Sequence, residues 1–480
     1  MTSLRDGTAR PISAETHGAL ARTAGVTAAT TLTIYIVLLF VVPSNTSIAA
    51  LGGLGRPAQL WGLFLLFWWA LSRLQARTPG TLRSVPQPVR YALAAFVVIA
   101  LVSFAAAMLR GQPADQVSPA TTALLRLASW SGVLLVAMDG IRTYSDVAKL
   151  IRRLSLAGAA MAALGLVQFF TGQTWLDWIV NIPGLAFEGT DAAMRGSFTR
   201  ASGTAIHPLE YGTAVVAAIP LAITTAVNKG FRTTPSRYAG WWWAPVAVIL
   251  FASVVSVSRS ALIGMVVAVI ASLPAIPAAY RWLIGVGGGI IAIGVFAFVP
   301  GMFGTIMNLF VGASDDPSTQ SRTAALARVP EFLSSSPLIG QGFGTFLPRY
   351  YIFDNAWVLL LVELGILGAL CLAMMVLVAM GSAIWSSRHS PFADVRAMGR
   401  ALVASLLTIS VLLIFFDGLS FPISAGLLFL MIGLTASVRT VAAADEDLVG
   451  ALRHVSRPEP AQPAASVLPQ AKSAQREAVK

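Results

Sequence analysis

Charged residues are scarce in this sequence. Asp, Glu, Lys and Arg together account for 11% of the 480 residues, whereas hydrophobic residues account for 56%. A soluble domain carries about 25% charged residues, so the composition excludes an ordinary water-exposed fold. The mean hydropathy is +0.74, and we therefore predict an all-α polytopic membrane protein.

Cysteine and histidine are also rare. The single cysteine, Cys371, excludes an intrachain disulfide and a cysteine metal cluster. The four histidines are His17, His207, His389 and His454. The formal net charge is +12, but the basic residues fall between apolar runs. Membrane topology explains this charge better than nucleic-acid binding does, and we expect no nucleic-acid partner.

Apolar runs long enough to cross a bilayer recur along the chain. A helix needs about 17–25 residues to cross the hydrocarbon core. Twelve such spans are predicted, near residues 26–42, 58–75, 90–109, 120–138, 148–171, 210–227, 241–257, 260–279, 282–299, 356–381, 398–416 and 421–438. The first run lacks a small-residue cleavage site, so we expect no cleavable signal peptide.

The distribution of Lys and Arg orients these spans. With the N-terminus in the cytoplasm, 24 of the 33 basic residues lie inside, eight lie outside, and Arg126 falls within the fourth span. This asymmetry predicts that both termini are cytoplasmic. The predicted organisation is a cytoplasmic arm (1–24), a transmembrane domain (25–440) and a cytoplasmic disordered tail (441–480), because the end of the tail has too few apolar residues to fold.

The outside arginines are concentrated in a few places. Six of the eight lie in two long loops, 172–209 and 300–355, or at the short turn that holds Arg259. Topology does not require positive charge there, whereas an anionic ligand on that side would. The larger loop, between spans nine and ten, has helical apolar spacing and aromatic residues, so we expect it to be folded and to hold part of an extracytoplasmic active site.

Two arginines near the predicted outer surface are candidates for binding phosphate. Arg200 and His207 precede the sixth span, where a helix N-terminus would favour an anion. Arg200 could equally extend to lipid headgroups. Arg259 joins spans seven and eight and needs a partner, which is either a phosphate or a structural carboxylate, Asp417 or Glu210.

The large loop supplies further candidates. Arg322 and Arg328 flank a helical pattern, and Arg349 and Asp354-Asn355 precede the tenth span. Between them, residues 336–346 carry Gly340, Gly342 and Gly344. No strand precedes these glycines, so a nucleotide-binding loop is rejected. We expect a tight backbone path at the membrane surface instead.

Taken together, these motifs resemble the O-antigen ligase and polymerase family of bacterial membrane glycosyltransferases. The matching segments are R-A-S-G-T-x-x-H-P at 200–208, S-R-S-A-L at 258–262, Arg322, P-L-I-G-Q-G-F-G-T-F at 337–346, and D-N-x7-E-L-G at 354–365. The resemblance implies a fold similar to the C-type glycosyltransferases. It also implies transfer of a glycan from an undecaprenyl-diphosphate carrier at the outer face of the cytoplasmic membrane, with no nucleotide sugar, cofactor or metal.

The chain departs from the family at the expected catalytic base. Members commonly have His-Asn where this chain has Asp354-Asn355. Asp354 can accept a proton, or it can serve as a helix N-cap. The other candidate base is His207, the only histidine that maps outside; we favour Asp354. Asn355, Arg328, Arg349, Glu210 and Asp417 are supporting candidates.

The predicted mechanism follows from the charges. Arg200, Arg259 and Arg322 would stabilise the leaving diphosphate, and a single displacement would invert the anomeric centre. The predicted function is a polymerase for surface or exopolysaccharide, with a ligase that attaches finished glycan to lipid or protein as the first alternative and a flippase for lipid-linked sugars as the second. Expected partners are the lipid-linked donor, a glycan or lipid acceptor, membrane lipids, and flippase and chain-length proteins.

Overall fold

The structure is a computed structural model that describes residues 27–75, 85–187, 194–195, 198–232, 237–299, 303–304, 307 and 317–455. The predicted N-terminal arm (1–24) and the last part of the predicted tail (456–480) lie outside these residues. Every candidate site residue named above lies within them.

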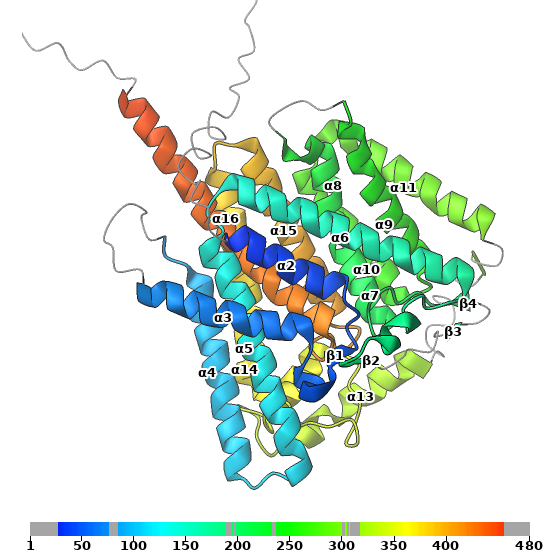
Figure 1. The fold of residues 1–480 in the computed structure, drawn as a ribbon, viewed down its shortest axis with the longest axis vertical. Helices are drawn as coiled ribbons and strands as arrows, with labels where there is room; N and C mark the ends of the chain where they lie inside the picture. The colour runs from blue at the N-terminus through cyan, green and yellow to red at the C-terminus, as the bar shows by residue number, and fades with distance from the viewer. Residues whose placement is uncertain are drawn as a thin grey trace, which may run out of the picture.

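The described chain is mainly helical (Figure 1). The helices are α2 (Ala28–Phe40), α3 (Pro57–Gln75), α4 (Pro88–Leu109), α5 (Ala114–Gly140), α6 (Tyr144–Thr171), α7 (Pro208–Ala217), α8 (Ile219–Val227), α9 (Trp243–Val255), α10 (Arg259–Ser272), α11 (Ala278–Phe298), α13 (Pro317–Leu333), α14 (Ala356–His389), α15 (Ala393–Leu412) and α16 (Pro422–Val455). Short antiparallel pairs join β1 (Thr46–Ile48) to β2 (Leu185–Phe187), and β3 (Met194–Arg195) to β4 (Phe198–Thr199). These strands are a small addition to the predicted all-α fold.

Seven helices among the described residues are long and apolar enough to cross a membrane. They start at Pro88, Ala114, Tyr144, Pro208, Ala356, Ala393 and Pro422. Each of the twelve predicted ranges overlaps a helix, although α2, α9 and α10 are shorter than a full span. The chain is thus a multi-pass membrane protein, and the number of twelve spans stays a prediction.

The prediction for the tail was partly wrong. Helix α16 continues to Val455, so residues 441–455 are helical rather than disordered. Figure 1 shows this helix extending beyond the rest of the bundle. The physical reason is that these residues include several Ala and Leu, which have high helix propensity. They also extend an existing helix, so no new nucleation is needed.

Small residues allow the central helices to pack closely. A Cβ added at Gly433 of α16 would lie 2.6 Å from the carbonyl oxygen of Leu134 of α5. A Cβ at Gly132 of α5 would lie 2.4 Å from the carbonyl oxygen of Gly62 of α3. Close backbone approach through small residues is typical of membrane helix pairs, and it places α5 between α3 and α16.

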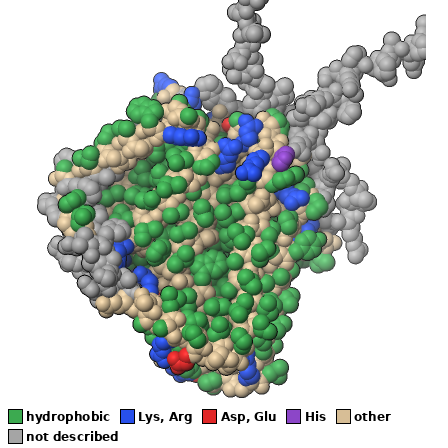
Figure 2. Space-filling model, turned by 180° about the vertical axis from the view of Figure 1, so that it is seen from behind, with side chains coloured by type: hydrophobic (Ala, Val, Ile, Leu, Met, Phe, Trp, Pro, Cys, Tyr) green, Lys and Arg blue, Asp and Glu red, His purple; other side chains and the backbone are tan. Residues whose placement is uncertain are grey.

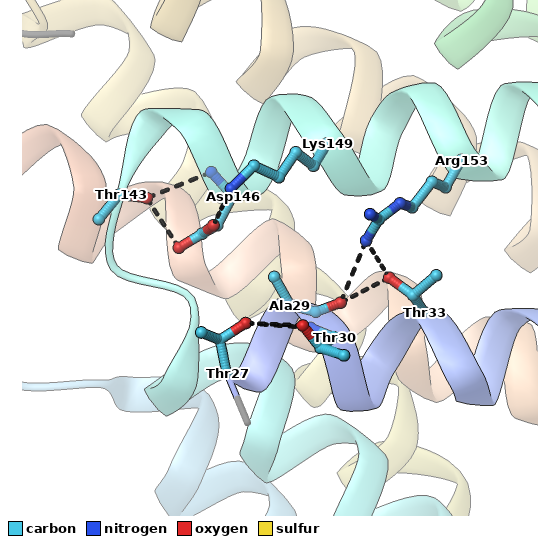
Figure 3. A network of polar contacts seen from close by, with 8 residues as sticks. All are labelled: Thr27, Ala29, Thr30, Thr33, Thr143, Asp146, Lys149 and Arg153. Carbon is cyan, nitrogen blue, oxygen red and sulfur yellow. Dashed lines mark hydrogen bonds and ion pairs between the residues drawn. The ribbon is translucent and has the colours of Figure 1, made fainter. Parts of the chain in front are cut away.

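Polar contacts cap α2 and α6 and link the two helices through Arg153 (Figure 3). Thr27 and Thr143 cap the two helices by accepting hydrogen bonds from the backbone N–H groups of Thr30 and Asp146. Arg153 of α6 then donates to the carbonyl oxygen of Ala29 of α2 at 3.5 Å. The network therefore ties together two helices that are far apart in the sequence.

Helix α14 is interrupted where the glycine-rich loop packs against it. Its backbone leaves the helical region at Gly365, with φ 68° and ψ −171°. Before the break, the carbonyl oxygen of Val362 accepts a hydrogen bond from the N–H of Gln341 at 3.0 Å. After the break, the N–H of Ile366 donates to the carbonyl oxygen of Pro337 at 2.9 Å. The loop thus satisfies backbone groups that a broken membrane helix would otherwise leave unpaired.

The loop glycines confirm the prediction of a tight backbone path. A Cβ at Gly340 would lie 2.3 Å from the carbonyl oxygen of Glu363, and one at Gly344 would lie 2.5 Å from the Cβ of Ala123. Gly340 and Gly344 also have φ of 72° and 73°, a region that other residues rarely adopt. The loop therefore needs glycine both for its conformation and for space between α5 and α14.

Candidate active site

A cavity of about 680 Å³ lies between α5, the loop that precedes α14, the first turns of α14 and the segment that joins α15 to α16. Five acidic or basic side chains line it. They are Arg126, His207, Asp354, Glu363 and Asp417. The structure thus places both predicted bases, and the supporting candidate Asp417, in one cavity.

Asp354 and Asn355 have different roles. The side-chain oxygen of Asn355 accepts hydrogen bonds from the N–H groups of Trp357 (3.0 Å) and Val358 (3.2 Å), so Asn355 is the N-cap of α14. Asp354 lines the cavity, and its carboxylate has no hydrogen bond or ion pair with any described residue. The N-cap alternative for Asp354 is therefore wrong, because its neighbour fills that position. Its carboxylate is left available to a ligand.

His207 caps α7 from the other side of the cavity. Its Nδ1 accepts a hydrogen bond from the N–H of Leu209 at 3.1 Å, so in the neutral ring the proton lies on Nε2. Burial lowers the pKa of His207, the nearby Arg200 lowers it further, and Asp354 partly opposes both effects. The acceptor nitrogen of His207 is thus already occupied by Leu209, which is unfavourable for a general base.

Asp417 belongs to the segment between α15 and α16, and it lies near Asp354. Burial raises its pKa to about 6, although hydrogen bonds from Ser420 and the charge of Arg126 work in the opposite direction. Asp354 contributes to the rise because two negative charges close together repel. One of its oxygens, Oδ1, is buried and has no hydrogen-bond partner.

The hydrogen bonds of Glu210 indicate a structural role. Its Oε2 accepts hydrogen bonds from the hydroxyl of Ser44 (3.0 Å) and the N–H of Ile206 (3.1 Å). Its Oε1 accepts one from the N–H of Ile423 at 2.6 Å, in the first turn of α16. The residue is fully buried and does not line the cavity. It connects the segment after α2 with the beginnings of α7 and α16.

None of the three predicted phosphate-binding arginines is part of the cavity lining. Arg200 follows β4 and lies close enough to His207 to affect its charge. Arg322 donates from Nη2 to the carbonyl oxygen of Phe415 at 2.7 Å, directly before Phe416 and Asp417 in the cavity wall. Arg259 is the first residue of α10. The residue two positions before it, Val257, is buried with φ 49°, which is strained for a β-branched side chain.

Two supporting candidates are held at the surface. Arg328 forms an exposed ion pair with Glu331 at 3.2 Å, and Arg349 pairs with exposed Asp115. Neither arginine lines the cavity. Exposed pairs of this kind contribute little to stability. Both arginines already have partners within the protein, so their positions do not require a substrate.

Sequence reasoning did not assign Arg126 and Glu363 to the site. Both are ionisable residues inside predicted membrane spans, which is in itself a signal of function. The Nε of Arg126 is buried, and no described residue forms a hydrogen bond or ion pair with this side chain. Glu363 is buried directly before the break in α14, where the N–H groups of Gly344 and Phe346 donate to its carboxylate.

Aromatic side chains hold the loop over the cavity. The rings of Phe346 and Phe353 are 5.4 Å apart, and Phe332 of α13 meets Phe346 edge-on at 5.0 Å. Phe346, Phe353 and Tyr351 all line the cavity. Such contacts stabilise a fixed loop conformation, so Asp354 is held in place from both sides. No group of three or more His, Cys, Asp or Glu residues that could bind a metal occurs in the described part of the chain.

Comparison with known proteins gives a family match for part of the chain. No curated protein matches the chain. Residues 244–373 match the family model described as O-antigen ligase. The matched segment contains Arg259, Arg322, the glycine-rich loop, Asp354 and the broken part of α14. The match over residues 244–373 supports the resemblance of this chain to the O-antigen ligase and polymerase family.

Proposed function

We propose that this protein is a surface-polysaccharide polymerase that transfers glycan from an undecaprenyl-diphosphate-linked donor to a hydroxyl of an acceptor glycan. The reaction takes place at the outer face of the cytoplasmic membrane. The family supports glycan transfer by an enzyme of the ligase or polymerase type. The observation that carries the finer proposal is the carboxylate of Asp354, which lines the cavity while Asn355 caps α14.

The proposed reaction is a single displacement without a metal. Asp354 accepts the proton of the acceptor hydroxyl, and the hydroxyl oxygen forms a bond to the anomeric carbon of the donor. The bond from that carbon to the diphosphate oxygen breaks, and undecaprenyl diphosphate leaves with the electron pair. Attack from the opposite face inverts the anomeric centre, and protonated Asp354 then releases its proton to solvent.

Arginines near the cavity stabilise the leaving group in this proposal. We place the diphosphate at the membrane surface, where Arg200, Arg259 and Arg322 are predicted to lie. Fixed guanidinium groups stabilise developing phosphate charge and match its geometry. His207, with its proton on Nε2, fits the role of a hydrogen-bond donor to the same group.

The alternative is a ligase that attaches finished glycan to lipid or protein, which the description of the matching family favours. We favour a polymerase because Arg outnumbers Lys by 29 to 4, a bias typical of GC-rich bacterial genomes, and such bacteria need not carry lipopolysaccharide. An assay of purified protein in detergent, given lipid-diphosphate oligosaccharide alone, distinguishes a polymerase from a ligase and from a flippase. A polymerase lengthens the oligosaccharide, a ligase needs a second acceptor, and a flippase forms no product without a membrane.

The test of the base is Asp354→Asn. The amide keeps the size of the side chain, and Asn355 retains the N-cap, so folding should change little. Single-turnover transfer from the lipid-diphosphate oligosaccharide should fall by at least about a hundredfold, the usual contribution of a general base. Donor binding should persist. Asp354→His should restore part of the rate because imidazole titrates near neutrality.

The matched control is Asp115→Asn, which changes an exposed aspartate outside the cavity and should leave the rate unchanged. His207→Gln should have a milder effect than Asp354→Asn. Normal transfer by Asp354→Asn together with no transfer by His207→Gln would reverse the assignment of the base. Normal transfer by both variants would show that no side-chain base is needed.

A further inference from the structure

Arg126 and Asp417 carry opposite charges at the deep end of the cavity. The cavity follows α5 from Ser118 to Trp130, a distance of about 18 Å along a helix. Arg126 and Trp130 lie at the end of this stretch that is farther from the start of α5. Asp417 enters from the segment between α15 and α16.

Both charged side chains have an unsatisfied polar atom. The Nε of Arg126 and the Oδ1 of Asp417 are buried and have no hydrogen-bond partner. The two residues interact electrostatically, but among the described residues no ion pair joins them. Two opposite charges that face one cavity without touching leave room for a bridging group. Leaving both unsatisfied is unfavourable unless a ligand or water pairs with them.

The surrounding charges restrict what that group can be. An anion would be attracted by Arg126 but repelled by Asp417 and Asp354, which line the same cavity. A cation would be repelled by Arg126. A hydroxyl group satisfies both partners, because its O–H donates to the carboxylate while its oxygen accepts from the guanidinium. The pair is therefore matched to a neutral, hydroxyl-rich ligand.

An aromatic wall completes the arrangement. Trp130 is four residues after Arg126 on α5 and so lies on the same face of the helix. It lines the cavity, and its ring is held by stacking on Phe429 of α16, with centroids 5.3 Å apart. A rigid indole offers a flat apolar surface. Such a surface fits the C–H face of a pyranose ring whose hydroxyls are equatorial.

We propose that Arg126, Asp417 and Trp130 form a binding subsite for a neutral sugar ring of the acceptor glycan. This inference rests on the proposed function. Asp354 lies close to Asp417, so a ring held in the subsite places one of its hydroxyls near the base. The subsite selects for uncharged sugars and does not include Arg200, Arg259 or Arg322. All three of its residues lie outside the segment 244–373 that matches the family model.

Saturation-transfer NMR tests this subsite without a donor or any catalysis. The protein in nanodiscs is titrated with phenyl β-glucoside as the neutral probe and phenyl β-glucuronide as the anionic probe. We expect the glucoside to bind and the glucuronide to bind more weakly. Asp417→Asn and Arg126→Gln should each weaken glucoside binding about tenfold or more, since each removes a charge-assisted hydrogen bond. The control Asp115→Asn should bind as the wild type does.

Each other result overturns the proposal. Stronger binding of the glucuronide, lost in Arg126→Gln, would show an anion site. Absence of binding by either probe would show that only water bridges the pair. Equal binding of the glucoside by the wild type and by all variants would show that the sugar binds at another site. Size-exclusion profiles of the variants distinguish lost binding from lost folding. Probe binding without glycosyl transfer would reject the proposed function and retain a sugar site, whereas transfer without probe binding would reject the subsite alone.

Discussion

The environment of Asp417 makes protein stability depend on pH. Burial raises the pKa of this carboxyl from 3.8 to about 6, so the folded protein holds the proton more tightly than the unfolded chain does. The stabilising contribution is fully present below about pH 4 and is lost as pH rises through 6. At pH 7.5, ionised Asp417 destabilises the fold by up to about 3 kcal/mol.

The corresponding prediction concerns Asp417→Asn, which cannot ionise. Its thermal unfolding midpoint should exceed that of the wild type at pH 7.5, and the two should converge near pH 4. The measurement is thermal unfolding in detergent at both pH values, with Asp115→Asn as the control. A difference of equal size at both pH values would show that the carboxyl is not held in its neutral form. A residue that lowers stability at neutral pH is more easily explained by function than by folding.

Arg259 provides a second prediction for a single residue. An ammonium group cannot form the two-pronged contact that a guanidinium makes with phosphate. Arg259→Lys should therefore lose most transfer activity while its expression and membrane insertion remain normal. Arg349→Lys, which changes an exposed ion-paired arginine, is the control and should stay active.

Transfer assays on equal amounts of folded enzyme provide the measurement. Full activity in both Arg259→Lys and Arg200→Lys would argue against a diphosphate clamp. Loss of the folded protein in Arg259→Lys would instead support a structural ion pair. The strained backbone at Val257 is consistent with either role, because strain is retained only where neighbouring packing enforces it.

Among the elements, the contact between the glycine-rich loop and broken α14 controls the shape of the cavity. Gly340→Ala would bring a Cβ to 2.3 Å from the backbone of Glu363, so the loop or the helix must move. Gly111→Ala is a matched control, because Gly111 also has positive φ (77°) but has open space around it. Gly111→Ala should lower the free energy of unfolding by about 1–2 kcal/mol, from backbone conformation alone.

Gly340→Ala should lower the thermal unfolding midpoint more than Gly111→Ala does, and it should also lower transfer activity. The additional loss measures the steric contact between loop and helix. Similar midpoints for the two variants would show that the loop is free to move away from α14. In that case the loop would not position Asp354, which follows it in the chain.

For the whole molecule, membrane orientation is the decisive property. Figure 2 shows a largely hydrophobic face with Lys and Arg side chains toward both its upper and its lower edge. The predicted excess of basic residues on the cytoplasmic side makes the orientation testable. Reporters fused after Arg90, Arg153, Arg237 or Arg400 should be active in the cytoplasm, and reporters within 310–345 should report the outside.

Alkaline phosphatase and green fluorescent protein fusions provide complementary readouts of this topology. A fusion after Gly111, in the short connection between α4 and α5, is the control for an outside position and should also report the outside. A cytoplasmic location for residues 310–345 would overturn the orientation, the extracytoplasmic site and the proposed donor together. The orientation remains a prediction until it is measured.

Much of the fold and part of the site were determined by the sequence itself. The apolar runs located the helices, because a segment must be apolar over about twenty residues to lie in hydrocarbon. The glycines at 340–344 indicated a close backbone path, because only glycine tolerates such contacts. The order of short motifs indicated the family, and the residue pair 354–355 indicated where the base would lie.

Only the tertiary structure decided which of these residues meet. The sequence left Asp354 as either base or N-cap, and the local geometry of α14 assigned the cap to Asn355. Arg126 and Asp417 are far apart in the chain, so no local pattern could place them in one cavity. Their proximity depends on small residues that let α5 and α16 pack closely. Helix periodicity is a local property of the chain, whereas the site is built from packing between distant helices, which the periodicity does not encode.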